Sequence, residues 1–97
     1  MNLQCEYEII QKEEIESDGI FYRYLLLASR DTNSLSLGIR LYSVRVEAKI
    51  GEKATFYQSG EIFANEKKAQ DFFIKIVSGL ATPVDLPYII EDCFMSF

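Results

Sequence analysis

The sequence predicts an α+β domain, in which an antiparallel meander of about four strands is followed by two carboxyl-terminal helices packed on one face. Apolar and charged residues alternate through the first part of the chain, which is typical of strands with one buried side. Apolar residues then recur at helical spacing, and both prolines, Pro83 and Pro87, stand where a second helix begins. We expect a single domain over residues 1–97.

The first two strands are expected at residues 3–16 and 20–30, which are rich in aliphatic and aromatic residues at alternating positions. Residues 17–19 between them read Ser-Asp-Gly, a polar turn in which the glycine can adopt a positive φ. The two runs together therefore predict a β-hairpin.

The length of the hairpin loop sets the register of its strands. A three-residue loop places Glu13 opposite Arg23 and Ile9 opposite Leu27, and each such pair favours the register by a few tenths to about 1 kcal/mol. A slip of one residue would place Glu14 opposite Arg23 and exchange the two faces of the strand. We therefore expect the register in which Glu13 pairs with Arg23.

A long third strand is expected at residues 35–50, after a second polar turn. Its apolar residues change from odd to even positions near Ser43, and a β-bulge at residues 42–43 would explain this change. The fourth strand is expected at residues 54–63, although Gly60 interrupts it.

The first helix is expected at residues 66–79. Asn65 is a favourable N-cap residue, and Gly79 is a natural stop. An apolar stripe at helical spacing predicts the side that packs on the sheet: Ala69, Phe72, Phe73, Ile76, Val77 and Leu80.

The second helix is expected at residues 83–96. Thr82 is the expected cap, Pro83 suits the first turn, and Asp85 would meet the positive end of the helix dipole. Pro87 would remove an early hydrogen bond, so the first turn is distorted or the cap is Asp85. A second apolar stripe follows: Leu86, Ile89, Ile90, Cys93, Phe94 and Phe97.

The final segment carries a resemblance to a known family. The motif Pro83-Val84-Asp85-Leu86, followed by Ile89-Ile90-Glu91-Asp92 and Phe94, is similar to the tail of short clostridial and other Firmicutes proteins that form a domain of unknown function. The resemblance implies a β-meander with two final helices, and it implies no activity. Members of the family usually have histidine where this chain has Asp85, so no role of that position carries over.

Composition argues against several classes of function. The net charge of −5 is unfavourable for binding DNA or RNA, because such proteins need cations that displace counterions from phosphates. The longest wholly apolar run covers only residues 24–28, whereas a membrane span needs about 20 residues. The amino terminus lacks the pattern of a signal peptide. We therefore expect a cytoplasmic protein that contacts neither nucleic acid nor membrane.

Residues that could hold a metal or act as nucleophiles are scarce. Cys5 and Cys93 lie among apolar residues at opposite ends of the chain, so we interpret them as buried thiols. No histidine is present, which excludes Ser-His-Asp and Cys-His catalysis and leaves the two thiols without partners for a tetrahedral metal site. We expect no cofactor, no metal and no catalytic residue.

Two acidic motifs have ordinary explanations. Residues 14–19 begin like a calcium-binding loop, but the position of the closing glutamate is occupied by Leu25. Glu91 and Asp92 are adjacent on the expected helix and point about 100° apart, so they cannot act on one substrate atom. We interpret both motifs as solvated surface.

The arginines are concentrated in the second and third expected strands: Arg23, Arg30, Arg40 and Arg45. They could neutralise the acidic first strand across the sheet, which is the interpretation we favour. Alternatively, Arg40 or Arg45 could hold an anionic ligand in a pocket between sheet and helices, as in a small-molecule binding protein or minor enzyme.

The second strand is apolar at both odd and even positions. If Phe21, Leu25 and Leu27 face the helices, four other residues are expected to form an interaction surface on the opposite, helix-free face: Ile20, Tyr22, Tyr24 and Leu26. Burial of these residues by a strongly curled sheet is the other interpretation. We therefore expect a non-enzymatic interaction or regulatory module that forms a homo-oligomer or binds a protein partner through this face or an open sheet edge.

Overall fold

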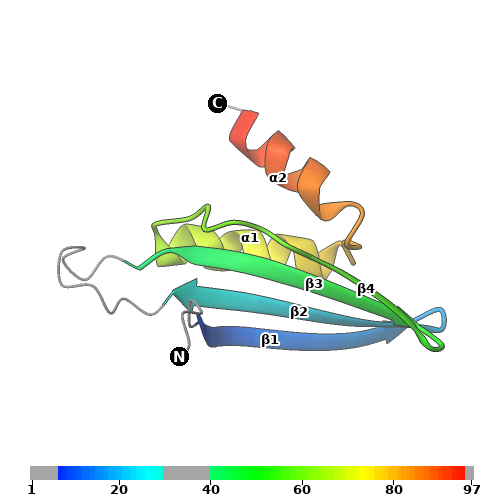
Figure 1. Cartoon of the computed structure of the whole chain (residues 1–97). Coiled ribbons are helices and arrows are strands. Elements are labelled where there is room, and N and C mark those ends of the chain that lie inside the picture. Colours follow the sequence, from blue (N-terminus) through cyan, green and yellow to red (C-terminus); the bar gives the residue numbers. More distant parts are fainter. Residues whose placement is uncertain (1–6, 30–39, 96–97) are drawn as a thin grey trace.

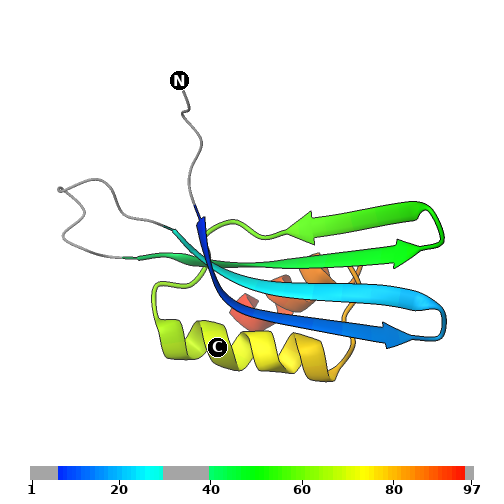
Figure 2. The same cartoon turned by 90° about the horizontal axis from the view of Figure 1, so that it is seen from below.

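The structure of the chain, a computed structural model, describes residues 7–29 and 40–95. Within these residues one antiparallel sheet, with strand order β1-β2-β3-β4, has both helices on the same face (Figures 1 and 2). The elements are β1 (Tyr7–Ser17), β2 (Ile20–Ser29), β3 (Tyr42–Ile50), β4 (Lys53–Gln58), α1 (Glu66–Ser78) and α2 (Leu86–Met95). The α+β prediction is confirmed. Expected strand residues 3–6, 30 and 35–39, the turn between strands two and three, and residue 96 lie outside the described residues.

The β1–β2 hairpin has a two-residue turn, not the three-residue loop expected from the sequence. Asp18 and Gly19 both have positive φ, 55° and 80°, which the right-handed twist of a hairpin favours. Consequently Glu14, and not Glu13, lies opposite Arg23. The predicted register was therefore wrong by one residue in the half of the hairpin next to the turn.

A β-bulge in β1 restores the predicted register further from the turn. The ladder between β1 and β2 shifts between Ile9 and Gln11, so that Ile9 lies opposite Leu27, as expected. The bulge predicted at residues 42–43 is absent, because β3 pairs with β2 without interruption from Tyr42 to Lys49. The irregularity of the meander is therefore in its first strand.

The buried core lies between the sheet and the helices, and the even-numbered residues of β2 form its centre. Tyr24, Leu26 and Ala28 have no exposed surface, and Tyr22 is 7% exposed. They pack with residues of β3, α1 and the start of α2: Val44, Val46, Phe72, Phe73, Ile76 and Leu86.

The predicted orientation of β2 was therefore inverted. Tyr22, Tyr24 and Leu26 face the helices, and the half-buried Ile20 also packs against this core. The hydroxyl of Tyr24 donates a hydrogen bond to the carbonyl oxygen of Ala81, at 2.9 Å, in the connection between the helices. Tyr24 can lie inside because this partner satisfies its polar end.

Helix α1 has the predicted start and stops at Gly79 as predicted, but the left-handed residue of its cap is Leu80. The side chain of Asn65 accepts a hydrogen bond from the backbone N–H of Lys68 at 3.0 Å, as expected of an N-cap. At the other end Gly79 has φ −91°, and Leu80 adopts the left-handed conformation with φ 52°. The N–H of Ala81 then bonds to the carbonyl of Ile76, which closes a Schellman-type cap.

Helix α2 begins with a reciprocal capping arrangement. The N–H of Asp85 donates to the hydroxyl of Thr82 at 3.1 Å, and the N–H of Thr82 donates to the carboxylate of Asp85 at 3.3 Å. The regular helix starts only at Leu86, after a turn that contains Pro83, so the expected distortion of the first turn is observed. Leu86 is fully buried, and the helix then runs away from the sheet (Figure 1).

Candidate functional site

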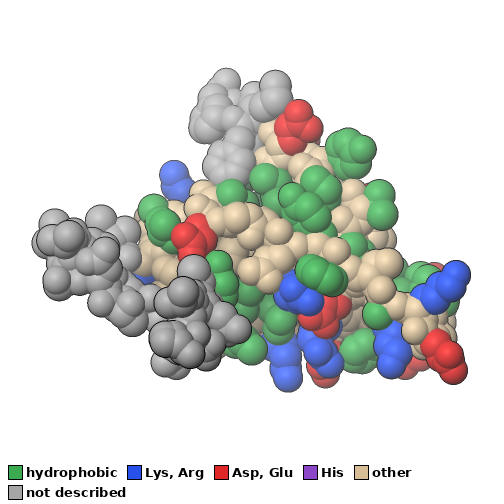
Figure 3. Space-filling model, in the orientation of Figure 1, with side chains coloured by type: hydrophobic (Ala, Val, Ile, Leu, Met, Phe, Trp, Pro, Cys, Tyr) green, Lys and Arg blue, Asp and Glu red, His purple; other side chains and the backbone are tan. Residues whose placement is uncertain are grey.

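The face of the sheet opposite the helices, called here the helix-free face, carries a mixed set of side chains. Its residues follow from the register, because directly opposite residues of antiparallel strands point to the same side. Figure 3 shows Lys and Arg side chains gathered along the lower margin of the molecule, below the strands of Figure 1, with hydrophobic groups among them. The face comprises Tyr7, Ile9, Lys12, Glu14, Glu16, Phe21, Arg23, Leu25, Leu27, Ser29, Ser43, Arg45, Glu47, Lys49, Ala54, Phe56 and Gln58.

A ladder of charged groups crosses the middle of the helix-free face. Arg23 lies between Glu14, at 3.0 Å, and Glu47, at 3.3 Å. Glu47 also accepts from Arg45 at 2.6 Å, and Arg45 donates to Gln58 at 3.2 Å. The cross-strand neutralisation favoured from the sequence is thus observed. Because these side chains are partly exposed, each pair contributes only about 0–1 kcal/mol.

Apolar groups flank this ladder at both ends of the face. Ile9 is 56% exposed at one end, and Phe56 at 59% and Phe21 at 37% lie toward the other. The guanidinium of Arg45 lies 3.9 Å from the ring centre of Phe56. Exposed aromatic groups are enriched on surfaces that bind proteins.

Three residues of the helix-free face are buried although no described helix covers them. Leu25 and Leu27 are 9% and 6% exposed, and neither belongs to the core beneath the helices. Ser43 has no exposed surface, and its hydroxyl has no hydrogen-bond partner among the described residues. The sequence prediction placed the two leucines under the helices. Arg23 also has an odd number, so it points to the same side of β2 as the two leucines. A charged residue on that side indicates that the side faces away from the core.

The two arginines predicted to bind an anion are not brought together. Arg45 lies on the helix-free face, whereas Arg40 pairs with Glu8 and donates to the carbonyl oxygen of Ser29. Glu8 lies opposite Ala28, in the row that faces the helices. Each guanidinium is already occupied by protein acceptors, so the two do not form a common anion site.

A small polar cluster surrounds Tyr42 near the start of α1. The Tyr42 hydroxyl donates to the carboxylate of Glu66 at 3.2 Å, and Gln70 donates to the other oxygen of that carboxylate. Burial, followed by the charge of Glu66, raises the pKa of Tyr42 above its ordinary value. The cluster therefore favours a neutral phenol that fastens β3 to α1.

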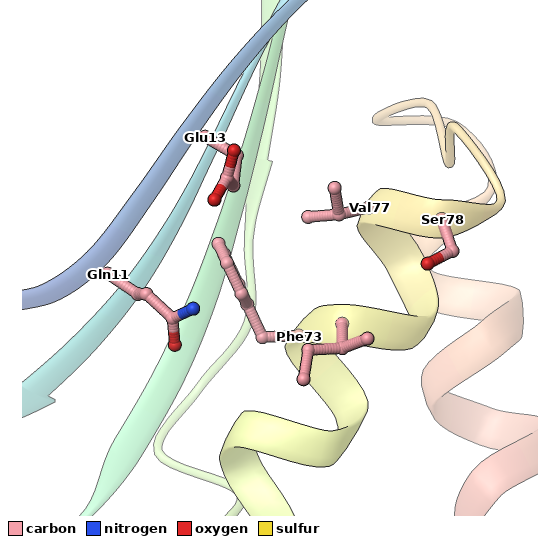
Figure 4. A pocket seen from close by; sticks show the side chains of 6 residues that line it. Gln11, Glu13, Phe73, Val77 and Ser78 are labelled. Carbon is pink, nitrogen blue, oxygen red and sulfur yellow. The ribbon is translucent and has the colours of Figure 1, made fainter.

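A groove of about 280 Å³ lies between the edge strand β1 and α1 (Figure 4). Gln11 and Glu13 project into it from β1, and Phe73, Ile74, Val77 and Ser78 line it from α1. A shallower hollow of about 470 Å³ lies on α2, beside Tyr88, Ile89, Glu91 and Asp92. The charged residues in both linings are acidic, so neither suits the anionic ligand considered from the sequence.

The described part of the chain lacks the features of a metal site and of a membrane-spanning helix. No three Cys, Asp or Glu side chains converge there to hold a metal ion. Cys93 is a half-buried residue of α2, while Cys5 lies outside the described residues. None of the described helices has the length and apolar character needed to cross a bilayer.

The chain matches the model of a protein family over nearly its whole length. The model of a family of unknown function, DUF6514, covers residues 2–96, which confirms the resemblance to a domain of unknown function but does not address a clostridial origin. Neither the curated proteins nor the solved structures contain a match.

Proposed function

Since this chain belongs to the DUF6514 family, which brings no activity with it, we propose from its geometry that it is a non-enzymatic interaction module that self-associates through the helix-free face. The observation that carries the proposal is the exposure of Ile9, Phe21 and Phe56 on a sheet face that no described helix covers. Large apolar groups at the surface gain about 25 cal/mol per Å² when a partner removes them from water. A cytoplasmic location fits such a module and belongs to the same proposal.

A second copy of the chain is the occupant that the charges of this face favour. Most natural homodimers have a two-fold axis, which brings the same patch of both copies together. Suppose that the two-fold axis lies in the plane of the interface and is perpendicular to the strands. Each strand would then stack on the same strand of the second copy, which runs in the opposite direction. Lys12 would then meet Glu14 of the second copy, and Arg45 would meet its Glu47, because each pair occupies adjacent rows of the face.

The same axis also brings apolar groups together. Leu27 and Phe21 lie at opposite ends of β2 on this face, so the two-fold axis places the exposed Phe21 of one copy over the buried Leu27 of the other, and Phe21 supplies the exposed apolar area of this contact. Two sheets packed in this way, about 10 Å apart, form an aligned β-sandwich. Charge complementarity in the middle and apolar contacts at the ends would fix its register.

The size of the face sets the expected affinity. Four strands about 4.8 Å apart and about eight residues long at 3.3 Å per residue cover about 500 Å² per copy. The pair of copies would bury about 1,000 Å², which is the lower limit for a specific interface. We therefore expect a reversible dimer with a dissociation constant in the micromolar range or weaker.

Sedimentation equilibrium over a concentration series tests the proposal. Ile9→Glu is expected to abolish dimerisation, because it places a charge in the apolar end of the interface opposite Glu16 of the second copy. Ile74→Glu is the matched control, since Ile74 is 55% exposed, against 56% for Ile9, and lies on α1 at the other side of the sheet. A wild-type chain that stays monomeric at millimolar concentration would refute self-association.

A charge exchange tests the two-fold arrangement itself. Lys12→Glu is expected to weaken the dimer about fivefold to tenfold, because the new glutamate would face Glu14 of the second copy and the dimer contains two such contacts. Adding Glu14→Lys should restore affinity in the double variant. If the double variant is as weak as the single one, the face dimerises in another orientation or not at all.

A further inference from the structure

The outer side of β1 is an open sheet edge, distinct from the helix-free face. Among the described strands β1 pairs with β2 alone, so alternate residues of β1 direct their backbone N–H and C=O groups away from the sheet. Between the bulge and the turn, from Gln11 to Ser17, the ladder is regular. Such an edge is a template on which another strand can form.

Helix α1 provides a surface beside this edge, on one side of the sheet. In Figure 2 α1 projects past β1, so a strand added to β1 would lie with one side against the helix. The groove of about 280 Å³ is located at this junction, between Gln11 and Glu13 of β1 and the exposed Ile74 and half-buried Val77 of α1 (Figure 4). An added strand could therefore bury apolar side chains on α1 while its backbone pairs with β1.

The charges of β1 determine which strand can be added. Glu13 and Glu16 form no ion pair among the described residues, and Glu14 shares Arg23 with Glu47. Lys12 is the single cation of the strand, against Glu8 and these three acids. Like charges directly opposite one another destabilise a strand pair. A second β1 is therefore a poor partner, whereas a basic strand would neutralise the edge.

We propose that the groove between β1 and α1 binds an extended basic peptide segment, which adds to the sheet as a strand next to β1. Apolar side chains of the peptide at alternate positions contact Ile74 and Val77, and its Lys or Arg residues at the intervening positions meet Glu14 and Glu16 on the other side of the sheet. Backbone pairing supplies affinity, and the alternating pockets and charges supply specificity.

The acidic edge also limits which strands can pair with β1. Charged residues and bulges are common devices that protect an edge from aggregation. In β1 the bulge at Ile10 ends the regular edge on one side and the β-turn at Asp18 ends it on the other. An acidic or neutral strand would leave the carboxylates uncompensated, so the same device that prevents aggregation selects a basic partner.

Fluorescence anisotropy with the labelled peptide Thr-Lys-Val-Lys-Val-Lys-Thr tests this site on the full chain. We expect saturable binding that weakens with added salt, because exposed charges contribute to it. Replacing the central Lys by Pro removes a backbone N–H and should weaken binding about tenfold or more. The peptide with Glu in place of Lys should not bind. Equal binding of the Pro-containing and parent peptides would overturn strand addition.

Variants of the protein locate the site. Ile74→Lys is expected to weaken peptide binding about tenfold, because it removes the apolar surface of α1 and adds a repelling cation, while the dimer is unchanged. Ile9→Glu should abolish the dimer and keep peptide binding, so the two proposals fail separately. Circular dichroism checks that each variant is folded. The groove would be refuted as the site if folded Ile74→Lys bound the peptide as well as the wild-type chain does. It would also be refuted if Ile9→Glu, and not Ile74→Lys, lost peptide binding.

Discussion

Tyr24→Phe removes one buried hydrogen bond with almost no change in shape. The Tyr24 hydroxyl donates to the carbonyl of Ala81 at 2.9 Å, Tyr24 has no exposed surface and Ala81 is 4% exposed. The substitution leaves this carbonyl without its partner in an environment that excludes water, which costs about 1–3 kcal/mol. We therefore expect the free energy of unfolding to fall by about 2 kcal/mol, a large part of the roughly 5–15 kcal/mol available to a small domain.

Urea unfolding followed by circular dichroism measures this loss, and a thermal scan gives a second reading. For a domain of this size 1 kcal/mol corresponds to about 4–8 °C in Tm, so a fall of about 8–16 °C is expected. Tyr22→Phe is the control. Its ring lies 6.1 Å from that of Tyr24, yet its hydroxyl has no hydrogen bond among the described residues. The control should lose less than about 0.5 kcal/mol.

The same hydroxyl makes stability sensitive to alkaline pH. Burial, and then the charges of Tyr22 and Asp85, raise the pKa of Tyr24 from 10.0 to about 12. The unfolded chain therefore loses this proton first, so the contribution of Tyr24 to stability is complete below pH 10 and declines as pH rises from about 10 to about 12. Tyr24→Phe should show a shallower decline than Tyr22→Phe. Equal stabilities for the two variants, with equal slopes above pH 10, would refute the reasoning.

Three further substitutions test other parts of the fold. Ser43→Ala should raise the free energy of unfolding by about 1 kcal/mol, because it removes a buried hydroxyl that has no described partner; a loss of stability in urea unfolding would contradict this. Asp85→Ala should cost about 1 kcal/mol, since Thr82 loses its reciprocal partner, and faster hydrogen exchange in the first turn of α2 would accompany it. Gly19→Ala should cost about 1 kcal/mol through its φ of 80°, although the space beside it is open, and a neutral result by thermal unfolding would exclude backbone strain there.

Interactions between residues close in the sequence were sufficient to predict the helices and strands and several of the positions at which they end. The helical spacing and the cap at Asn65 predict α1 within one residue of its observed bounds. Thr82 and Asp85 form the expected capping contact, and the distortion expected from two prolines appears as a helix that starts at Leu86. These features depend on residues a few positions apart, which is why they can be read directly from the chain.

The predicted register of the β1–β2 hairpin was wrong next to the turn, although the residues of the turn indicate the observed register. Asp18-Gly19 is a strong signal for a two-residue turn, and giving it priority would have placed Glu14 opposite Arg23. The bulge near Ile10 has no comparable signal in the sequence, because the residues before and after it could point to either face of the sheet. The pairing of Ile9 with Leu27 was therefore predicted correctly from a register that applies only beyond the bulge.

The sequence by itself determined that this chain forms strands, then helices, with a charged ladder across the sheet. Only the tertiary structure decided which side of β2 is the inside, since that strand is apolar at both parities and periodicity gives no preference between them. The choice depends on distant partners: Tyr24 reaches Ala81, and Tyr42 reaches Glu66, only when the even side faces the helices. The candidate surfaces, the helix-free face and the β1–α1 groove, follow from that long-range choice.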